Sequence, residues 1–425
     1  MTRFALISYT RRRCRRLARC VPRRDGHPHR GAAMSEAIKT LAKDLAFSRD
    51  EYEERCRRLR ALMPGARVDV LLVHQPSSVF YFSGYENLHV YDNECVVIPQ
   101  DGPVNLLVPH GDLTRAQLTS WIEPALTFLP GAEPATILAQ RLIEQGFGRA
   151  RIGVEKRVAR AAGLSVHVFE ALQAALPQAT LVDTSGLPER VKLVKSAQEI
   201  SHLRTAATYT DAGIRAALAA AAEGGTDNDV AAAAYHAMVR AGSEFLSIPA
   251  IVNGGVYTGV SHSTHRRHRL DKGDVLFLEL GGCHRRYSAP CMRTAAIGMV
   301  SDEAQRLADG CLAALDSMHA MMRPGVTFHA VTDAAARGIA RSGARVDWNG
   351  DCGYPVGAGF PPHWGDYTCR IRPGTEMTLV PGMVFHQPIA LRVPGRIGVA
   401  FSETVLITET GCEALTRTER SLVVC

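Results

Sequence analysis

The hydrophobic pattern of this chain changes near residue 190, and that change restricts the chain to two differently built domains. Ahead of it, short apolar runs alternate with amphipathic stretches, which is typical of alternating strands and helices. Behind it, long Ala-rich stretches precede strand-rich ones. The 425 residues also exceed what one hydrophobic core usually serves. We therefore expect an α/β domain over residues 34–190 and an α+β domain over residues 191–425.

The elements expected in the N-terminal domain follow from their periods. Amphipathic spacing predicts helices at 48–63, 116–122 and 135–146. Short apolar runs predict strands at 68–73, 93–99, 103–109 and 151–155.

The C-terminal domain should begin with a long helix, because Ser196 and Glu199 are spaced as a capping box. Strand patterns follow at 274–282, 287–298, 383–391 and 398–408, and helical patterns at 302–322 and 328–342. Runs of helices beside runs of strands favour an α+β domain with a curved antiparallel sheet.

Positive charge is concentrated in residues 1–33, which hold ten Arg against one acid, Asp25. The net charge of this segment is +9 and that of the whole chain is +7, so the net charge of the remaining residues is −2. We expect it to be a disordered extension, either a transit peptide or sequence upstream of a true start at Met34. The folded body therefore shows no sign of binding nucleic acid. No stretch suits a membrane span or a secretory signal, so we expect a cytoplasmic protein.

The eleven cysteines are scattered and form no C-x-x-C pair. This usage indicates reduced thiols and gives no support to a structural zinc cluster. Cys283 and Cys291, which lie near the candidate site residues below, are expected to be small buried hydrophobic side chains.

Two glutamates fall on apolar faces of predicted strands. In DVLFLEL, alternation groups Glu279 with Val275 and Phe277, and in AFSETVLIT it groups Glu403 with Phe401. A buried carboxylate needs a cation, strong donors or a cavity, so the two positions indicate a site. The alternative is that both are structural glutamates bound to Arg293 or to backbone amides.

Two loops supply further candidates. His262 lies in a Gly-punctuated loop just before the Glu279 strand and is a candidate general acid or base, whereas His265 and His268 are expected to be solvated. The segment GYPVGAGFPPHWGDY carries Tyr354, His363 and Trp364 on a Gly- and Pro-rich loop that can line a pocket.

These segments resemble the pita-bread family of creatinase, prolidases and Xaa-Pro aminopeptidases over about residues 45–425. VKLVKSAQEISHLRTAA looks like the family's R-x-x-K-S-x-x-E-I entrance to the second domain. His262, eleven residues before Gly273, matches the family's active-site His. The resemblance implies the α/β plus pita-bread architecture already expected from the pattern.

The family's metallopeptidases bind two metal ions through two Asp, one His and two Glu. By their surrounding motifs, these five positions are filled here by Glu279, Pro290, Tyr354, Pro388 and Ser402. Glu403 stands where the family has the Asp that adjoins the last ligand. Proline has no donor atom, and Tyr or Ser replaces His or carboxylate poorly toward a divalent ion. The resemblance therefore implies no metal and no other cofactor, and argues against peptidase activity.

The segments LELGGCHRRYSAPCMRT, GYPVGAGFPPHWG and MVFHQPIA look most like ectoine hydrolase, a metal-free member that opens a cyclic amidine. This likeness implies a C–N hydrolase in which His262 moves a proton, Glu279 pairs with or attacks the amidinium carbon, and Glu403 positions one of them. Arg293 would pair a substrate carboxylate or brace Glu279. The residues implied in substrate binding are Tyr354, His363, Trp364, His386, Arg293, Tyr287, His89 and Tyr91.

Two alternatives remain at this point, a creatinase-type hydrolase of another guanidino or betaine-like compound and an inactive binding protein. The segment ENLHVYDNE departs from the corresponding stretch of ectoine hydrolases, so the exact substrate stays open. The resemblance also implies a homodimer in which the N-terminal domain of one subunit covers the active site of the other.

Overall fold

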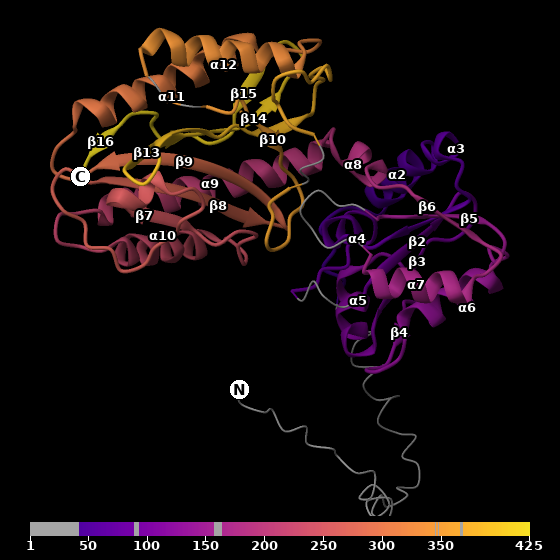
Figure 1. Ribbon diagram of the computed structural model, residues 1–425. Coiled ribbons are helices and arrows are strands. Elements are labelled where there is room, and N and C mark those ends of the chain that lie inside the picture. The colour runs from indigo at the N-terminus through magenta and orange to yellow at the C-terminus, as the bar shows by residue number, and fades with distance from the viewer. Residues whose placement is uncertain (1–41, 89–92, 157–163, 345, 347, 366–368) are drawn as a thin grey trace, which may run out of the picture. The chain divides into compact units, whose positions relative to one another are not determined.

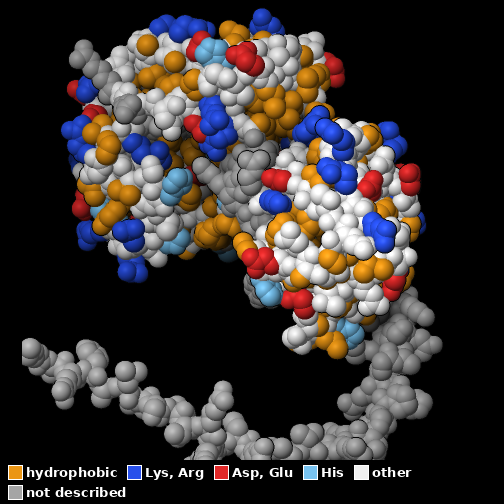
Figure 2. Space-filling model, turned by 45° about the vertical axis from the view of Figure 1, so that its right-hand side comes forward, with side chains coloured by type: hydrophobic (Ala, Val, Ile, Leu, Met, Phe, Trp, Pro, Cys, Tyr) orange, Lys and Arg blue, Asp and Glu red, His pale blue; other side chains and the backbone are white. Residues whose placement is uncertain are grey.

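The computed structural model describes residues 42–88, 93–156, 164–344, 346, 348–365 and 369–425. The predicted extension at 1–33 and the candidates His89 and Tyr91 lie outside these residues. Residues 43–425 form one compact unit. Within the described residues, no helix is long and apolar enough to cross a membrane. On the face drawn in Figure 2, basic, acidic and hydrophobic side chains are interspersed.

The first part of the chain forms a mixed six-stranded sheet in the order β4-β3-β2-β1-β5-β6. Its strands are β1 (Val70–Val73), β2 (Cys95–Pro99), β3 (Asn105–Pro109), β4 (Leu126–Phe128), β5 (Arg151–Val154) and β6 (Thr180–Asp183). The central strand β1 pairs antiparallel with β2 and parallel with β5. Its helices are α2 (Arg49–Arg60), α3 (Met63–Ala66), α4 (Pro76–Ser83), α5 (Leu113–Thr119), α6 (Pro134–Glu144), α7 (Val166–Ala175) and α8 (Leu187–Lys192), with a 3-10 turn η1 (His110–Asp112). The strands and helices predicted for this part are present.

The second part begins with the predicted long helix α9 (Ala197–Ala220), whose first turn is closed by the Ser196–Glu199 capping box. With α10 (Asp227–Ala241) it lies along one side of a sheet ordered β16-β9-β8-β7, as Figure 1 shows. The strands are β7 (Ile251–Gly254), β8 (Val275–His284), β9 (Tyr287–Ala296) and β16 (Val423–Val424), and the turn η2 (Gly255–Gly259) follows β7. All pairs in this sheet are antiparallel except β16 with β9.

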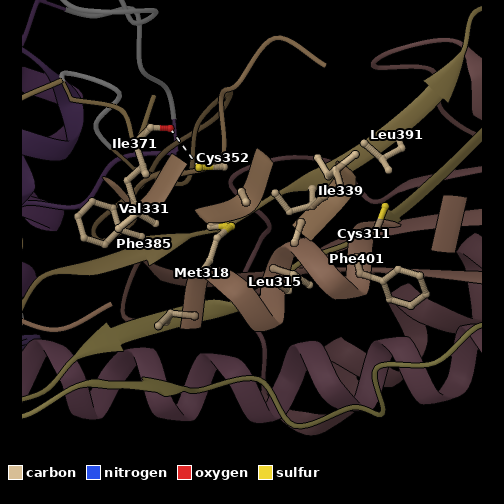
Figure 3. Close-up of a cluster of buried hydrophobic side chains, with 14 of the residues drawn as sticks. Cys311, Leu315, Met318, Val331, Ile339, Cys352, Ile371, Phe385, Leu391 and Phe401 are labelled. Carbon is tan, nitrogen blue, oxygen red and sulfur yellow. Dashed lines mark hydrogen bonds between the residues drawn. The ribbon is translucent and has the colours of Figure 1, made fainter. Parts of the chain in front are cut away.

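The helices α11 (Asp302–Met321) and α12 (Phe328–Ser342) cover the remaining strands. These strands are β10 (Tyr354–Pro355), β11 (Val384–His386), β12 (Ile389–Val393), β13 (Ile397–Phe401), β14 (Thr404–Ile407) and β15 (Cys412–Ala414). Figure 3 shows the hydrophobic core between them, where Leu315 and Met318 of α11 lie near Val331 and Phe385. This core holds β11 and the β12–β13 hairpin in place.

Two of the predicted strands are interrupted, and the curved sheet is divided into a separate β12–β13 hairpin and a four-stranded sheet β10-β11-β14-β15. The predicted run 383–391 breaks at Gln387 and Pro388, because proline has no N–H for a ladder. The run 398–408 breaks at Ser402 and Glu403. The alternation that grouped Glu403 with Phe401 is therefore wrong, since no continuous strand joins them.

Candidate active site

Glu279 lies in the middle of β8, opposite Ile251 of β7 and Met292 of β9. Its side-chain neighbours on that face include Phe277 and Met292, which form a buried hydrophobic cluster with Ala400. Glu279 is 8% exposed, and its carboxylate makes no hydrogen bond or ion pair within the described part of the chain. Burial raises its pKa to about 7, partly opposed by the charge of Arg392. A carboxylate held in this way is available to a ligand.

Arg392 is the cation that faces Glu279, and the sequence interpretation missed it. It lies on β12, with its guanidinium carbon 5.3 Å from the ring centroid of Phe277. Its buried Nε has no hydrogen-bond partner among the residues that the structure describes. Burial lowers the pKa of Arg392, while the charge of Glu279 acts in the opposite direction. Alternation along Ile389–Val393, which puts Ala390 and Arg392 on one face, was the signal that could have found it.

Asn253 and Ser263 add two more polar groups with unused bonding capacity. Asn253 pairs with Phe277 across β7 and β8, so its side chain shares the sheet face of Glu279. Its Nδ2 donates to the Ser263 carbonyl at 2.9 Å, which attaches the loop that carries His262 to the sheet. Asn253 Oδ1 and Ser263 Oγ are buried and have no hydrogen-bond partner in the described segments. Buried polar atoms of this kind are uncommon and indicate a place where a ligand or water binds.

His262 itself lies in that loop with a φ of 57° and an exposed side chain. Within the described residues its side chain makes no hydrogen bond to Glu279 or Glu403. His262 is therefore part of the loop that Asn253 anchors. It lies next to Ser263, whose hydroxyl has no hydrogen-bond partner in the described part of the chain.

A line of hydrogen bonds joins three predicted pocket residues. Trp364 Nε1 donates to Tyr354 Oη at 3.1 Å, and Tyr354 Oη lies 2.7 Å from His386 Nδ1. His386 Nε2 lies 2.6 Å from Ser402 Oγ, which accepts a further hydrogen bond from Met292 N at 2.6 Å. The line ends at the residue that faces Glu279 across β8 and β9.

Each member of this line is held by packing. Burial lowers the pKa of His386 to about 3, so its imidazole is neutral at ordinary pH. Trp364 covers Gly281, two residues from Glu279 on the same face of β8. A Cβ at Gly281 would lie 2.9 Å from Trp364 Cε3, so only glycine permits this close approach. The line therefore has both of its ends beside the Glu279 face.

Glu403 is part of a buried ion pair. Arg293 Nη2 lies 2.8 Å from Glu403 Oε1, both side chains are 2% exposed, and Thr416 donates to the other carboxylate oxygen. Arg293 leaves β9 on the face opposite that of Met292, because neighbouring strand residues alternate. Arg293 thus binds Glu403, as the structural alternative expected, and the idea that it braces Glu279 is wrong.

All five N–H donors of Arg293 are used. Nε donates to Glu419 O, Nη1 to Met292 O and Ser402 O, and Nη2 to Glu403 and Thr418 O. No donor remains for a substrate carboxylate. Because the same guanidinium binds Met292 O and Ser402 O, the Glu403–Arg293 pair fixes the contact between Ser402 and β9.

Replacing Glu403 with Gln is expected to lower the free energy of unfolding by about 3 kcal/mol, because it leaves the buried charge of Arg293 without its partner. Chemical denaturation followed by circular dichroism measures this change. The matched control is Glu413→Gln, which removes the carboxylate that binds Arg204 in an exposed pair and should change stability by less than about 1 kcal/mol. Equal stability of the two variants would contradict a structural role for Glu403.

Two predicted substrate-binding residues remain, Tyr287 and His363. Tyr287 is on the face of β9 that packs toward α9, and its hydroxyl donates to Glu199 Oε1 at 2.9 Å. His363 is partly exposed and precedes Trp364 in the loop. The cysteines of the described residues are free thiols, as the sequence predicted, and burial raises the pKa of Cys283 and Cys291 to about 12.

The donor set for two metal ions does not fit this site. Of the five ligand positions, only Glu279 carries a carboxylate or imidazole. Both ring nitrogens of the nearby His386 are bonded to the hydroxyls of Tyr354 and Ser402, which leaves no lone pair for a metal. Within the described residues, no three His, Cys, Asp or Glu side chains are grouped so that they could hold an ion.

Comparison with known proteins agrees with this architecture. Residues 55–194 match the creatinase/prolidase N-terminal domain, and residues 201–409 match metallopeptidase family M24. An ectoine hydrolase of Halomonas elongata is 28% identical over 404 residues, covering 89% of this chain and 98% of that protein. An uncharacterized hydrolase/peptidase of Sinorhizobium fredii is also 28% identical, over 89% of this chain and 99% of its own length.

The fold has solved counterparts. An Xaa-Pro dipeptidase from Bacillus anthracis superposes with a TM-score of 0.76 at 20% identity, covering 88% of this chain and 100% of that one. The chain therefore belongs to metallopeptidase family M24, a family of hydrolases, and carries the creatinase/prolidase N-terminal domain ahead of its M24 domain.

Proposed function

We propose that this protein is a metal-independent hydrolase that cleaves a C–N bond of a small zwitterionic nitrogen compound, with ectoine or hydroxyectoine as the first candidate. The observation that carries the proposal is the pair of opposite charges on one buried face. Glu279 has no hydrogen-bond partner among the described residues, and the Nε of Arg392 has none either. A zwitterion with an amidinium and a carboxylate complements both groups.

The chemistry follows from the nature of an amidinium carbon, which is electrophilic without a Lewis acid. Glu279 either pairs with the amidinium N–H groups or attacks the amidinium carbon. Because burial raises the pKa of this carboxyl to about 7, it can accept and release a proton near neutral pH. His262 transfers the proton between water and the leaving nitrogen. Arg392 takes the role of carboxylate partner that the sequence had suggested for Arg293.

Two findings favour ectoine over a peptide. The similarity to the ectoine hydrolase of Halomonas elongata extends over nearly the full length of both proteins. The five ligand positions of the family's peptidases hold a set of side chains that cannot bind two ions.

A substrate panel tests the proposal. The purified protein is incubated with ectoine, hydroxyectoine, creatine and dipeptides ending in Pro, before and after dialysis against a chelator, and ring opening or amine release is followed by chromatography. We expect turnover of ectoine or hydroxyectoine that the chelator does not change. Cleavage of the dipeptides, or loss of turnover with restoration by manganese or zinc, would contradict the proposal.

Replacing Arg392 with Met is expected to raise KM about 30-fold with a smaller change in kcat, because a charge-assisted hydrogen bond to a substrate carboxylate is worth about 2 kcal/mol in both the ground and transition states. Steady-state kinetics with ectoine measures both constants. Arg396→Met is the matched control, because Arg396 lies on the same hairpin and pairs with Glu303 at the surface. A selective loss of kcat in Arg392→Met would rule out a role in carboxylate binding.

We also propose that the protein acts as a homodimer in which the partner's N-terminal domain covers the site. Two large apolar side chains support this, because Val256 within η2 and Val260 directly after it are 54% and 46% exposed, next to the His262 loop. Sedimentation equilibrium should give twice the chain mass of 46.1 kDa, and a monomer at assay concentration would contradict it.

A further inference from the structure

Asn253 and Ser263 offer a buried acceptor and a buried hydroxyl beside the Glu279 face. Asn253 is 2% exposed and Ser263 is 6% exposed. Because Asn253 Nδ2 donates to the Ser263 carbonyl at 2.9 Å, the orientation of the amide is fixed and Oδ1 is the atom left over. Among the described residues, neither Asn253 Oδ1 nor Ser263 Oγ has a hydrogen-bond partner. The two residues therefore retain one acceptor and one hydroxyl that both donates and accepts.

The place of Asn253 in the sheet puts its side chain beside Phe277. These two residues stand directly opposite each other on β7 and β8, so their Cβ atoms lie about 5 Å apart on one face. The guanidinium carbon of Arg392 lies over the same ring, 5.3 Å from its centroid. Glu279 follows two residues along β8 on that face. Asn253 and Arg392 are thus both neighbours of one aromatic side chain next to Glu279.

Packing also keeps the hairpin that carries Arg392 next to the loop that carries Ser263. The Gly398 amide of β13 donates to Thr258 Oγ1 of η2 at 2.9 Å. A Cβ at Gly398 would collide with the Thr258 carbonyl, so the β12–β13 hairpin and η2 are in close contact. The turn η2 leads directly into the loop of Ser263. Arg392 and Ser263 therefore belong to two segments that touch.

We propose that Asn253 Oδ1 and Ser263 Oγ determine specificity by binding a hydroxyl group of the substrate. The preferred substrate is then a zwitterion with a hydroxyl on the carbon next to the one that carries its carboxylate. This inference rests on the proposed hydrolysis and narrows its substrate. The hydroxyl donates to Asn253 Oδ1 and accepts from Ser263 Oγ, while Arg392 binds the adjacent carboxylate.

The bonding capacity of the pair favours a hydroxyl over other substrate groups. An amidinium N–H group only donates, so it would leave the hydroxyl hydrogen of Ser263 without an acceptor. A hydroxyl both donates and accepts, and satisfies both protein groups at once. Hydroxyectoine has a hydroxyl next to its carboxylate-bearing carbon, whereas ectoine has none and leaves both groups unpaired. A site that hydrogen-bonds a substrate hydroxyl discriminates against the analogue that lacks it.

The first experiment compares two substrates that differ only by this hydroxyl. Steady-state kinetics gives kcat/KM for hydroxyectoine and for ectoine, and we expect the wild type to favour hydroxyectoine about tenfold or more. In Ser263→Ala this ratio should fall about fivefold or more, because one hydrogen bond to the hydroxyl is lost. Since both substrates meet the same protein, general damage to the loop changes both constants alike and cancels in the ratio.

Two further variants complete the comparison. Asn253→Leu should also lower the ratio, although it breaks the bond to the Ser263 carbonyl and so lowers both constants as well. Thr264→Ala is the matched control, because Thr264 follows Ser263 in the loop and its hydroxyl donates to the Ala250 carbonyl at 3.2 Å. It should keep the wild-type ratio. Circular dichroism confirms folding, and either Ser263→Ala or Asn253→Leu is sufficient for the comparison.

A wild-type preference for ectoine would overturn the inference. So would a ratio that neither Ser263→Ala nor Asn253→Leu lowers, because the two groups would then bind water alone. If neither compound is hydrolysed, the proposed function fails, and isothermal titration calorimetry with both compounds decides on the pair. Binding of hydroxyectoine about tenfold tighter than ectoine, with the difference lost in Ser263→Ala, would support the pair, and any other binding result would overturn it.

Discussion

Replacing Glu279 with Gln is expected to lower kcat/KM by about 10³-fold or more while making the folded protein more stable at pH 8. The catalytic loss follows because glutamine neither attacks an amidinium carbon nor neutralises its charge. The stability gain follows from burial, which raises the pKa of this carboxyl from 4.5 to about 7. At 1.36 kcal/mol per pKa unit, the folded state loses about 3 kcal/mol when the group ionises.

The sign of the pH dependence separates the two effects. Between pH 4.5 and about 7 the Glu279 carboxyl binds its proton more tightly in the folded state than in the unfolded state. The contribution of Glu279 to the free energy of unfolding therefore falls as the pH rises through that window. Activity should change in the opposite direction, because only the ionised carboxylate acts on the substrate, and kcat/KM should decrease below about pH 7.

Denaturation curves of wild type and Glu279→Gln at pH 4.5 and 8, together with a pH profile of kcat/KM, measure both quantities. We expect the variants to differ at pH 8 and to converge near pH 4.5. Glu403→Gln provides the contrast, since loss of that carboxylate destabilises the fold. Wild-type turnover in a well-folded Glu279→Gln protein would exclude this residue from the reaction.

Replacing His262 with Ala is expected to lower kcat by about 10³-fold without a comparable change in stability. General acid–base groups contribute about 10² to 10⁴ to the rate, and the side chain is exposed, so little packing is lost. Its φ of 57° is unfavourable for alanine, and His262→Gly removes the same imidazole without that strain. We therefore expect equal loss of activity in both variants and slightly greater stability in His262→Gly.

His265→Ala is the control for the His262 variants, because His265 lies in the same loop and, among the described residues, its side chain forms a hydrogen bond only with the adjacent Thr264 hydroxyl. It should keep wild-type kcat. If His262→Gly turned over ectoine at the normal rate, the proton would have to come from another group, and the mechanism proposed for His262 would be wrong.

Much of the fold was accessible from local patterns. The capping box at Ser196 predicted the start of α9, and alternation in DVLFLELGG predicted the strand β8 with Glu279 on an apolar face. Both features depend on residues only a few positions apart in the chain. A helix cap is formed by neighbouring residues, and the face of a strand on which a side chain lies follows from alternation along that strand. The sequence also showed that the metal-ligand positions of the family are replaced, because this follows from residue identity alone. Pro290, Tyr354 and Pro388 are three of these positions.

The partners of each buried group were decided by tertiary structure. Alternation predicts the face on which a side chain lies but not which distant strand covers that face. Arg392 reaches Glu279 because the β12–β13 hairpin packs on β8, more than a hundred residues earlier in the chain. Glu403 binds Arg293 because the break between β13 and β14 redirects its side chain.

The sequence by itself determined that this chain has two domains, a buried carboxylate at Glu279 and no donor set for two ions. Only the tertiary structure decided that Arg392, rather than Arg293, faces that carboxylate, and that Tyr354, His386 and Ser402 are joined in one line. The physical reason is that hydrogen bonds and ion pairs between distant segments require atoms within about 3 Å, and such distances are set by the packing of whole strands.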